Sequence, residues 1–214
     1  MKVIVFVSLT GFLLLCLLAP AGEADVTRRK RILFLGNSLT AGYGLEVAQP
    51  FPALIQKKID ALGWNYEVVN AGQSGDTTAG GLRRLDWFLS RKVHVLVLEL
   101  GANDGLRGIA PTVTRQNLQA IIDRTKDRYP NVQIVLAGMQ VPPNLGKAYT
   151  SLFKAIFPEL AKKNDAFLVP FLLEGVAGER RLNLPDGIHP SPEGHRIVAK
   201  NVWRVMKPIL RSMR

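Results

Sequence analysis

A serine, a histidine and an aspartate in this sequence have the types and spacing of a nucleophile, a base and an acid. Ser38 follows a short apolar run that ends at a glycine, whereas Asp186 and His189 lie three positions apart near the other end of the chain. A serine hydroxyl needs a base to remove its proton, and a histidine base needs a carboxylate to fix its tautomer. Gly187 and Pro190 indicate a stiff turn in which the carboxylate reaches the ring. The pattern predicts nucleophilic catalysis by Ser38.

The two other histidines fit the role of base less well. His94 lies inside an apolar run, where we expect a histidine whose hydrogen bonds are satisfied in the core or at a sheet edge. His195 lies in the first turn of the last expected helix, where we expect a surface residue. Ser38 also has two other interpretations, because it can cap the following helix or belong to a loop that holds a phosphate through backbone N–H groups.

Acyl transfer further requires hydrogen-bond donors at the oxygen that becomes negatively charged. Gly75 offers a backbone N–H and Asn103 offers a side-chain amide, and each follows a different expected strand. Since ligands bind at the carboxyl ends of the strands in open parallel sheets, both donors are expected beside Ser38. The alternative is that Gly75 is only a turn residue and Asn103 only a helix cap.

The elements that must position these residues alternate along the chain. Short apolar runs predict buried strands at 32–35, 66–70, 93–100, 132–137 and 166–169. Helical spacing predicts helices at 50–63, 77–90, 118–129 and 148–163, and a last one that starts after Ser191. Asp76 is expected to cap the second of these helices. The alternation predicts the α/β class, with a doubly wound, flavodoxin-like parallel sheet of about five strands in three α/β/α layers.

The N-terminus has the pattern of a secretory signal peptide. A basic start and an apolar stretch at 3–18 precede small residues at 19–24. Cleavage would divide the chain into a signal peptide, residues 1–24, and one hydrolase domain, residues 25–214, and would export the protein to the periplasm or the medium. An uncleaved anchor is the alternative, but this apolar stretch is shorter than the roughly 20 residues of a usual membrane-spanning helix.

The composition of the chain favours some classes of binding partner and argues against others. The formal net charge of +11 favours contact with anionic surfaces such as phospholipid head groups. The basic residues are scattered and lack interleaved aromatics, so we expect no specific nucleic acid partner. Cleavage after Ala21 or Ala24 would remove Cys16, the single cysteine, which excludes disulfides, thiolate metal sites and a cysteine nucleophile. We expect a monomer without metal or cofactor.

Four blocks of the sequence resemble those of the SGNH, or GDSL, hydrolases. They occur in the family's order, from about residue 31 to the C-terminus: Gly36–Leu39, Gly75, Gly101–Asp104 and Asp186–Pro190. The sequence looks most similar to the bacterial periplasmic thioesterase I, lysophospholipase and arylesterase branch. The resemblance implies a catalytic triad and an oxyanion hole: Ser38 as nucleophile, His189 as base, Asp186 as its orienting carboxylate, and the Ser38 N–H, the Gly75 N–H and the Asn103 amide as donors.

One position departs from the family pattern. Asn37 stands where these hydrolases usually carry aspartate, and this position is not a triad member. Activity is therefore expected to persist, while the local hydrogen bonding and its response to pH are expected to differ.

The resemblance implies an exported, metal-independent serine esterase that acts through an acyl-enzyme on carboxylic esters or thioesters, whether small molecules or lipids. Apolar residues near the expected site are predicted to line an acyl groove, although they can instead merely close the core: Leu106, Ile109, Val141, Pro142 and Leu145. A carbohydrate O-deacetylase of the same family is one alternative. A flavodoxin-like protein that binds phosphate or flavin is an alternative from another class.

Overall fold

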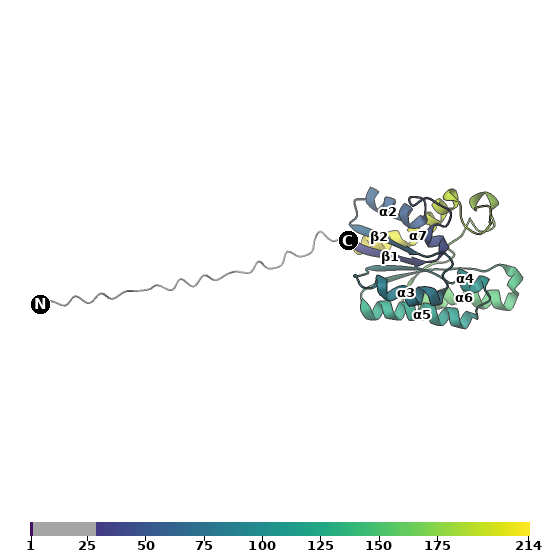
Figure 1. The fold of residues 1–214 in the computed structure, drawn as a ribbon, viewed down its shortest axis with the longest axis horizontal. Helices are drawn as coiled ribbons and strands as arrows, with labels where there is room; N and C mark the ends of the chain where they lie inside the picture. Colours follow the sequence, from purple (N-terminus) through teal and green to yellow (C-terminus); the bar gives the residue numbers. More distant parts are fainter. Residues whose placement is uncertain (2–28) are drawn as a thin grey trace.

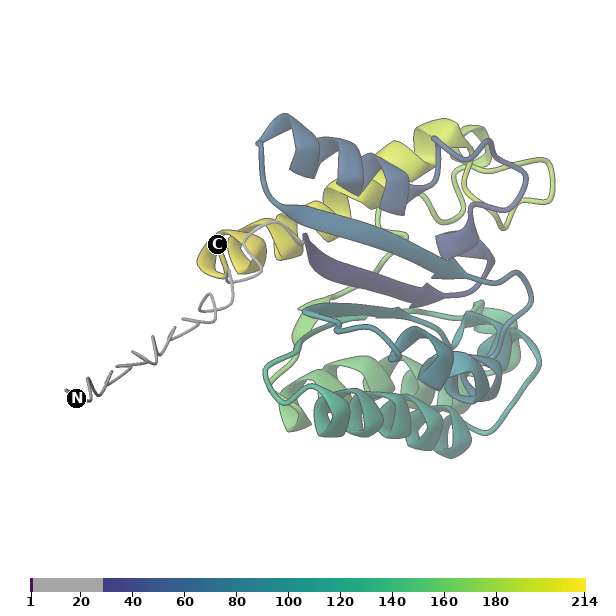
Figure 2. The ribbon, with the colours of Figure 1, turned by 60° about the vertical axis from the view of Figure 1, so that its left-hand side comes forward.

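Buried apolar runs form the central sheet of the computed structural model, which describes Met1 and residues 29–214 (Figures 1 and 2). The strands are β1 (Lys30–Gly36), β2 (Tyr66–Gly72), β3 (Val95–Glu99), β4 (Gln133–Ala137) and β5 (Phe167–Val169). They lie in the order β2-β1-β3-β4-β5, and each neighbouring pair is parallel. This order confirms the predicted doubly wound, flavodoxin-like α/β fold.

Helices cover both faces of the sheet. They are α1 (Ser38–Ala41), α2 (Phe51–Ala61), α3 (Thr78–Phe88), α4 (Ala102–Leu106), α5 (Pro111–Arg128), α6 (Lys147–Lys163) and α7 (Pro192–Ser212), with 3-10 turns η1 (Pro143–Leu145) and η2 (Arg180–Leu182). Helices α2 and α7 pack together on one face, whereas α3, α5 and α6 cover the other, as predicted for three layers (Figures 1 and 2). None of the described helices is both long and apolar enough to cross a membrane.

The strand register aligns the carboxyl ends of the first three strands. Gly36, the last residue of β1, pairs with Gly72 of β2 and with Glu99 of β3. The chain reverses its direction of sheet growth between β1 and β3, because β2 and β3 lie on opposite sides of β1. Such a switch point leaves a crevice at the carboxyl edge, and the segments that follow β1, β2 and β3 surround it.

The start of α3 corrects one prediction about capping. Thr77, and not Asp76, is the N-cap, since its side-chain oxygen accepts from the Gly80 N–H at 3.3 Å. The Asp76 carboxylate instead pairs with Arg84, with 2.6 Å between Oδ2 and Nε. By contrast, α7 begins as predicted, with Ser191 as its N-cap. The proposed signal peptide, Cys16 included, lies outside the described residues except for Met1, so the domain boundaries stay a prediction.

Candidate active site

The turn from β1 into α1 places Ser38 at the carboxyl edge. Asn37 is the N-cap of α1, because its Oδ1 accepts from the Leu39 N–H at 2.9 Å. Ser38 is therefore the first helical residue and not the cap, which leaves its hydroxyl available. Gly36 is required at the turn, since a Cβ there would lie 2.0 Å from Thr40 Oγ1.

The turn before α7 carries Asp186 and brings His189 to this serine from 151 positions away. Asp186 Oδ1 accepts from the backbone N–H groups of Ile188, at 2.9 Å, and His189, at 3.0 Å. Asp186 Oδ2 lies 2.7 Å from His189 Nδ1, and His189 Nε2 lies 2.9 Å from Ser38 Oγ. Gly187 has φ of +70°, a conformation that glycine adopts without strain. The three side chains thus form one continuous chain of contacts.

Hydrogen bonds keep the Asp186 carboxyl ionised. The backbone N–H of His189, then that of Ile188, then the His189 side chain lower the pKa of Asp186 to about 2. A carboxylate at this distance favours the tautomer of His189 with its proton on Nδ1. In this tautomer Nε2 accepts a hydrogen bond from the Ser38 hydroxyl, which is the arrangement needed to remove that proton.

Tyr43 also contacts the histidine, and sequence reasoning did not find it. Its ring centroid lies 4.6 Å from that of His189, with an angle of 38° between the rings. Gly42, in the left-handed conformation, ends α1 and turns the chain so that Tyr43 reaches this position. The sequence carries no signal for the contact, because an exposed tyrosine after a short helix has many structural explanations.

The two oxyanion donors predicted in addition to the Ser38 N–H lie at the same edge of the sheet. Asn103 Nδ2 donates to the Asp76 carbonyl at 2.7 Å, which holds the amide and leaves its second hydrogen for another acceptor. The cap of α4 is Gly101, so the alternative that Asn103 is a helix cap is wrong. Gly75 has φ of +82°, and Arg107 Nη2 donates to its carbonyl at 2.9 Å. Within residues 29–214, the N–H groups of Gly75 and Ser38 have no acceptor.

Arg84 connects the segments that carry these donors. Its guanidinium donates to Asp76 Oδ2 at 2.6 Å, to the Ala71 carbonyl at 2.7 Å and to the Gly36 carbonyl at 2.8 Å. Hydrogen bonds to an ionised group are about twice as strong as neutral ones. One partly buried side chain therefore ties the ends of β1 and β2 to the turn that holds Asn103.

The residues predicted to line an acyl groove lie on two segments next to these donors. Leu106 ends α4 and is 47 % exposed, and Ile109 follows it, with its carbonyl accepting from the Tyr149 hydroxyl at 2.7 Å. Val141 packs against α4, since a Cβ on Gly105 would lie 2.2 Å from Val141 Cγ1. Pro142 is exposed and Leu145 is partly buried in the segment that follows.

Comparison with known proteins agrees with this geometry. The model of the GDSL-like Lipase/Acylhydrolase family matches residues 34–197. The chain belongs to this family. It is 41 % identical to the esterase TesA of Pseudomonas aeruginosa, over 94 % of this chain and 98 % of that protein. It is 36 % identical to thioesterase 1/protease 1/lysophospholipase L1 of Escherichia coli, over 93 % of this chain and 92 % of that protein.

A solved structure extends the likeness to the fold of this acylhydrolase. A crystal structure of TesA superposes with a TM-score of 0.80 at 40 % identity, covering 84 % of this chain and 99 % of that one. The predicted resemblance to SGNH hydrolases is confirmed. The chain is an SGNH-type serine hydrolase of ester bonds, and the alternative of a phosphate- or flavin-binding protein is wrong.

The prediction that His195 of this hydrolase is a surface residue is wrong. Its side chain is 1 % exposed, and Nδ1 accepts from the Phe51 N–H at 3.1 Å, so it joins α7 to the start of α2. Burial, and then the charge of His189, lower the pKa of His195 to about 4, which keeps the ring neutral. His94 is satisfied as predicted, since its Nδ1 accepts from the Arg31 N–H at 2.9 Å.

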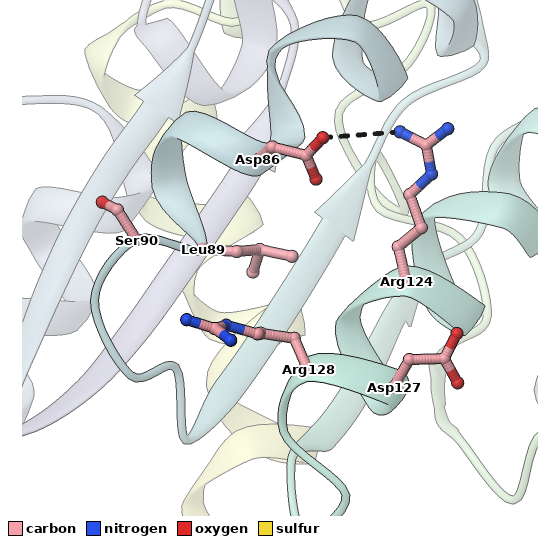
Figure 3. Close-up of a pocket in the computed structure, with 6 residues that line it drawn as sticks. All are labelled: Asp86, Leu89, Ser90, Arg124, Asp127 and Arg128. Carbon is pink, nitrogen blue, oxygen red and sulfur yellow. Dashed lines mark ion pairs between the residues drawn. The ribbon is translucent and has the colours of Figure 1, made fainter.

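A cavity of about 510 Å³ lies away from the catalytic edge of the acylhydrolase (Figure 3). It is lined by the last turns of α3 and α5, which end at the amino edge of the sheet: Asp86, Leu89, Ser90, Arg124, Asp127 and Arg128. The Asp86 and Arg124 side chains face each other across it at 3.7 Å (Figure 3). No predicted site residue lines this cavity. In the described part of the chain, no group of three or more His, Cys, Asp or Glu side chains could hold a metal ion.

Proposed function

We propose that this hydrolase is an exported esterase that cleaves carboxylic esters or thioesters through an acyl-enzyme on Ser38. The contact of Ser38 Oγ with His189 Nε2 at 2.9 Å, continued from His189 Nδ1 to Asp186 at 2.7 Å, carries the proposal. His189 removes the hydroxyl proton as Oγ attacks the acyl carbon, and the resulting imidazolium is stabilised by the Asp186 carboxylate. The leaving alcohol or thiol then takes the proton from Nε2.

Water completes the cycle by the same steps. His189 takes a proton from a water molecule, which attacks the acyl carbon, and Ser38 Oγ leaves with the proton from Nε2. The carbonyl oxygen becomes negatively charged in both halves of the reaction. Three donors at the carboxyl edge would stabilise it: the N–H groups of Ser38 and Gly75 and the second amide hydrogen of Asn103.

The assignment of the nucleophile is tested by labelling. A fluorophosphonate should form one adduct, located at Ser38 by mass spectrometry, and Ser38→Ala should abolish both the adduct and esterase turnover while the protein melts as the wild type does. Thermal melts keep the comparison to folded molecules. Labelling of another serine, or full turnover by Ser38→Ala, would exclude Ser38.

We propose that the apolar residues beside the oxyanion donors bind the acyl chains of lipid-like substrates. The exposed Leu106 side chain and its neighbour Val141 support this, as do the names of relatives that act as esterase, thioesterase and lysophospholipase. Leu106→Trp should shift the preference among p-nitrophenyl esters towards shorter chains. Leu62→Trp is the matched control, because Leu62 is 45 % exposed and follows α2 at the amino edge. A carbohydrate O-deacetylase would instead prefer acetylated sugars over every longer acyl donor, including lysophospholipids and acyl-thioesters.

We further propose that a basic groove between α2 and α7 contacts anionic phospholipid. A space of about 370 Å³ is lined by three apolar residues and four cations: Leu54, Ala61 and Ala199 with Lys57, Lys58, Arg196 and Lys200. Across residues 29–214, none of these cations pairs with a carboxylate. Both helices begin at the carboxyl edge (Figure 2). The groove follows α2 from Leu54 to its last residue, Ala61, and so extends away from that edge.

Vesicle binding tests this contact. The protein should sediment with phosphatidylglycerol vesicles and not with phosphatidylcholine vesicles, and Lys57→Glu together with Lys200→Glu should weaken binding. Lys154→Glu together with Lys162→Glu on α6, across the sheet, carries the matched charge change and should bind better than the groove double variant. Equal loss of binding from both variants would show that only the net charge matters.

We propose that the protein is a monomer, which light scattering after gel filtration would test.

A further inference from the structure

Glu99 is a buried carboxyl that the triad does not use. It ends β3 at the carboxyl edge, and none of its surface is exposed. Its Oε2 accepts from the Asn37 N–H at 3.2 Å and from the Thr40 hydroxyl at 2.7 Å. Asn37 and Thr40 lie on either side of Ser38 in the sequence, so one carboxyl oxygen holds both ends of the nucleophile turn.

Two buried polar atoms remain unpaired at the same place. Glu99 Oε1 and Asn37 Nδ2 have no hydrogen-bond partner within the part of the chain that the structure describes. The orientation of the Asn37 amide is set, because its Oδ1 accepts from the Leu39 N–H. Asn37 Nδ2 is therefore a donor, and the Asn37 N–H and the Thr40 hydroxyl both donate to this carboxyl.

A set of donors favours the ionised carboxyl, while burial opposes it. Burial raises the pKa of Glu99 to about 7, and the hydrogen bonds from Thr40 and Asn37 limit the rise. A proton on this carboxyl could be accepted only if the Thr40 hydroxyl turned from donor to acceptor, so the protonated group cannot keep the same contacts.

The charged and titratable groups of the surrounding elements contact other partners. Their pairings are Arg84 of α3 with Asp76, His189 with Asp186 and Ser38, and His195 of α7 with the Phe51 N–H. Burial and hydrogen bonds, and no ion pair, therefore set the charge of Glu99.

We propose that Glu99 is a positioning residue for the nucleophile: its carboxylate holds Asn37 and Thr40 so that Ser38 Oγ meets His189 Nε2, and protonation of this carboxylate lowers turnover. The inference rests on the proposed role of Ser38. A misplacement of about 1 Å at a reacting group can cost roughly 100-fold in rate, so a loosened turn has a measurable effect. Activity at acid pH then depends on the ionisation of Glu99.

Glu99→Gln tests the inference, because it keeps the shape of the side chain but replaces one carboxyl oxygen with an NH2 group. This donor then faces groups that donate to the wild-type carboxyl. We expect kcat to fall by roughly 10-fold to 100-fold with little change in KM. On logarithmic axes, the acid limb of kcat/KM should be steeper in the wild type than in the variant, because the variant lacks this titrating carboxyl. Asn37→Asp added to Glu99→Gln returns an acceptor to the pair, and we expect a recovery of about tenfold over Glu99→Gln alone.

Thr40→Val keeps the inference testable if Glu99→Gln does not fold. The Thr40 hydroxyl lowers the pKa of Glu99, so its removal should move the acid limb to higher pH. Thr125→Val is the matched control, since this buried hydroxyl donates to the Ile121 carbonyl at 2.7 Å within α5, and its acid limb should stay in place.

Two results would overturn the role of Glu99. One is a wild-type acid limb in both Glu99→Gln and Thr40→Val. The other is a Glu99→Gln protein that melts at a lower temperature yet turns over at the wild-type rate per titrated site. Either result with Ser38 still labelled by the fluorophosphonate removes this inference alone, whereas loss of Ser38 labelling in the wild type removes the proposed function itself.

Discussion

We expect Asn103→Ala to lower turnover by about 100-fold to 1,000-fold while KM changes little. The carbonyl oxygen of a bound ester is nearly neutral and needs little help from the amide. In the tetrahedral transition state the same oxygen carries most of a negative charge, and a fixed N–H donor then gains strength. The substitution therefore affects kcat, and an effect mainly on KM would contradict the proposed role.

The structure sets the size of this effect. The Asn103 amide has two hydrogens, and the contact with the Asp76 carbonyl at 2.7 Å uses one of them. Its loss thus removes one donor of three, since the N–H groups of Ser38 and Gly75 remain. Loss of one such donor costs roughly 3 to 4 kcal/mol in transition-state free energy, which corresponds to the expected fall. The remaining donors should keep turnover above that of Ser38→Ala.

The structural cost of the change is small and has a matched control. Asn103→Ala leaves the Asp76 carbonyl without its donor, which typically lowers the free energy of unfolding by about 1 to 3 kcal/mol. Asn117→Ala removes a comparable amide contact, because Asn117 Nδ2 donates to Thr78 Oγ1 at 3.0 Å from α5. The control should melt at a lower temperature with unchanged turnover per folded molecule.

Asn103→Asp separates the proposed role from a structural one. An ionised carboxylate offers no donor, and its negative charge would face the partly negative oxygen of the Asp76 carbonyl and the developing oxyanion. Turnover should be at least as low as in Asn103→Ala, measured by steady-state kinetics with active-site titration and thermal melts. An aspartate variant with near-wild-type turnover would refute the reasoning.

Four further expectations concern the triad, the buried groups and metal ions. His189→Ala should lose nearly as much turnover as Ser38→Ala, whereas His195→Ala should lower the melting temperature and keep turnover per folded molecule; equal loss of turnover in both would show that the base is misassigned. Asp186→Asn should keep more activity than His189→Ala in steady-state kinetics. Its Oδ1 can still accept from the Ile188 and His189 N–H groups, so only the tautomer of the base is lost. Burial raises the pKa of Glu99 from 4.5 to about 7, so the folded wild type becomes less stable as pH rises through that window. In urea unfolding, the free energy of unfolding of Glu99→Gln should therefore rise by up to about 3 kcal/mol relative to that of the wild type between pH 4.5 and a pH above 7. A difference that stays constant with pH would contradict this. EDTA should leave esterase turnover unchanged, and activity lost on chelation and restored by a divalent ion would show a metal requirement.

The sequence alone was sufficient to predict the sheet and the edge at which the chemistry lies. Runs such as Ile32–Leu35 are apolar on both faces, which is typical of strands inside a parallel sheet that helices cover on both sides. Strand ends then meet at one edge, which brings Ser38 and Asn103 together. The contact between Asp186 and His189 was also predictable, because it lies within one turn of four residues and depends little on the rest of the fold.

Contacts between distant segments were decided only by the tertiary structure. Helical spacing places His195 in the first turn of α7, but the packing of α2 over that turn buries it. Glu99 reads as the polar end of an apolar strand, and its partners Asn37 and Thr40 lie 62 and 59 positions away. Burial and hydrogen-bond donors set whether a carboxyl is charged, and long-range packing supplies both. The residue types could therefore be read from the sequence, whereas the charge states of these buried groups required the fold.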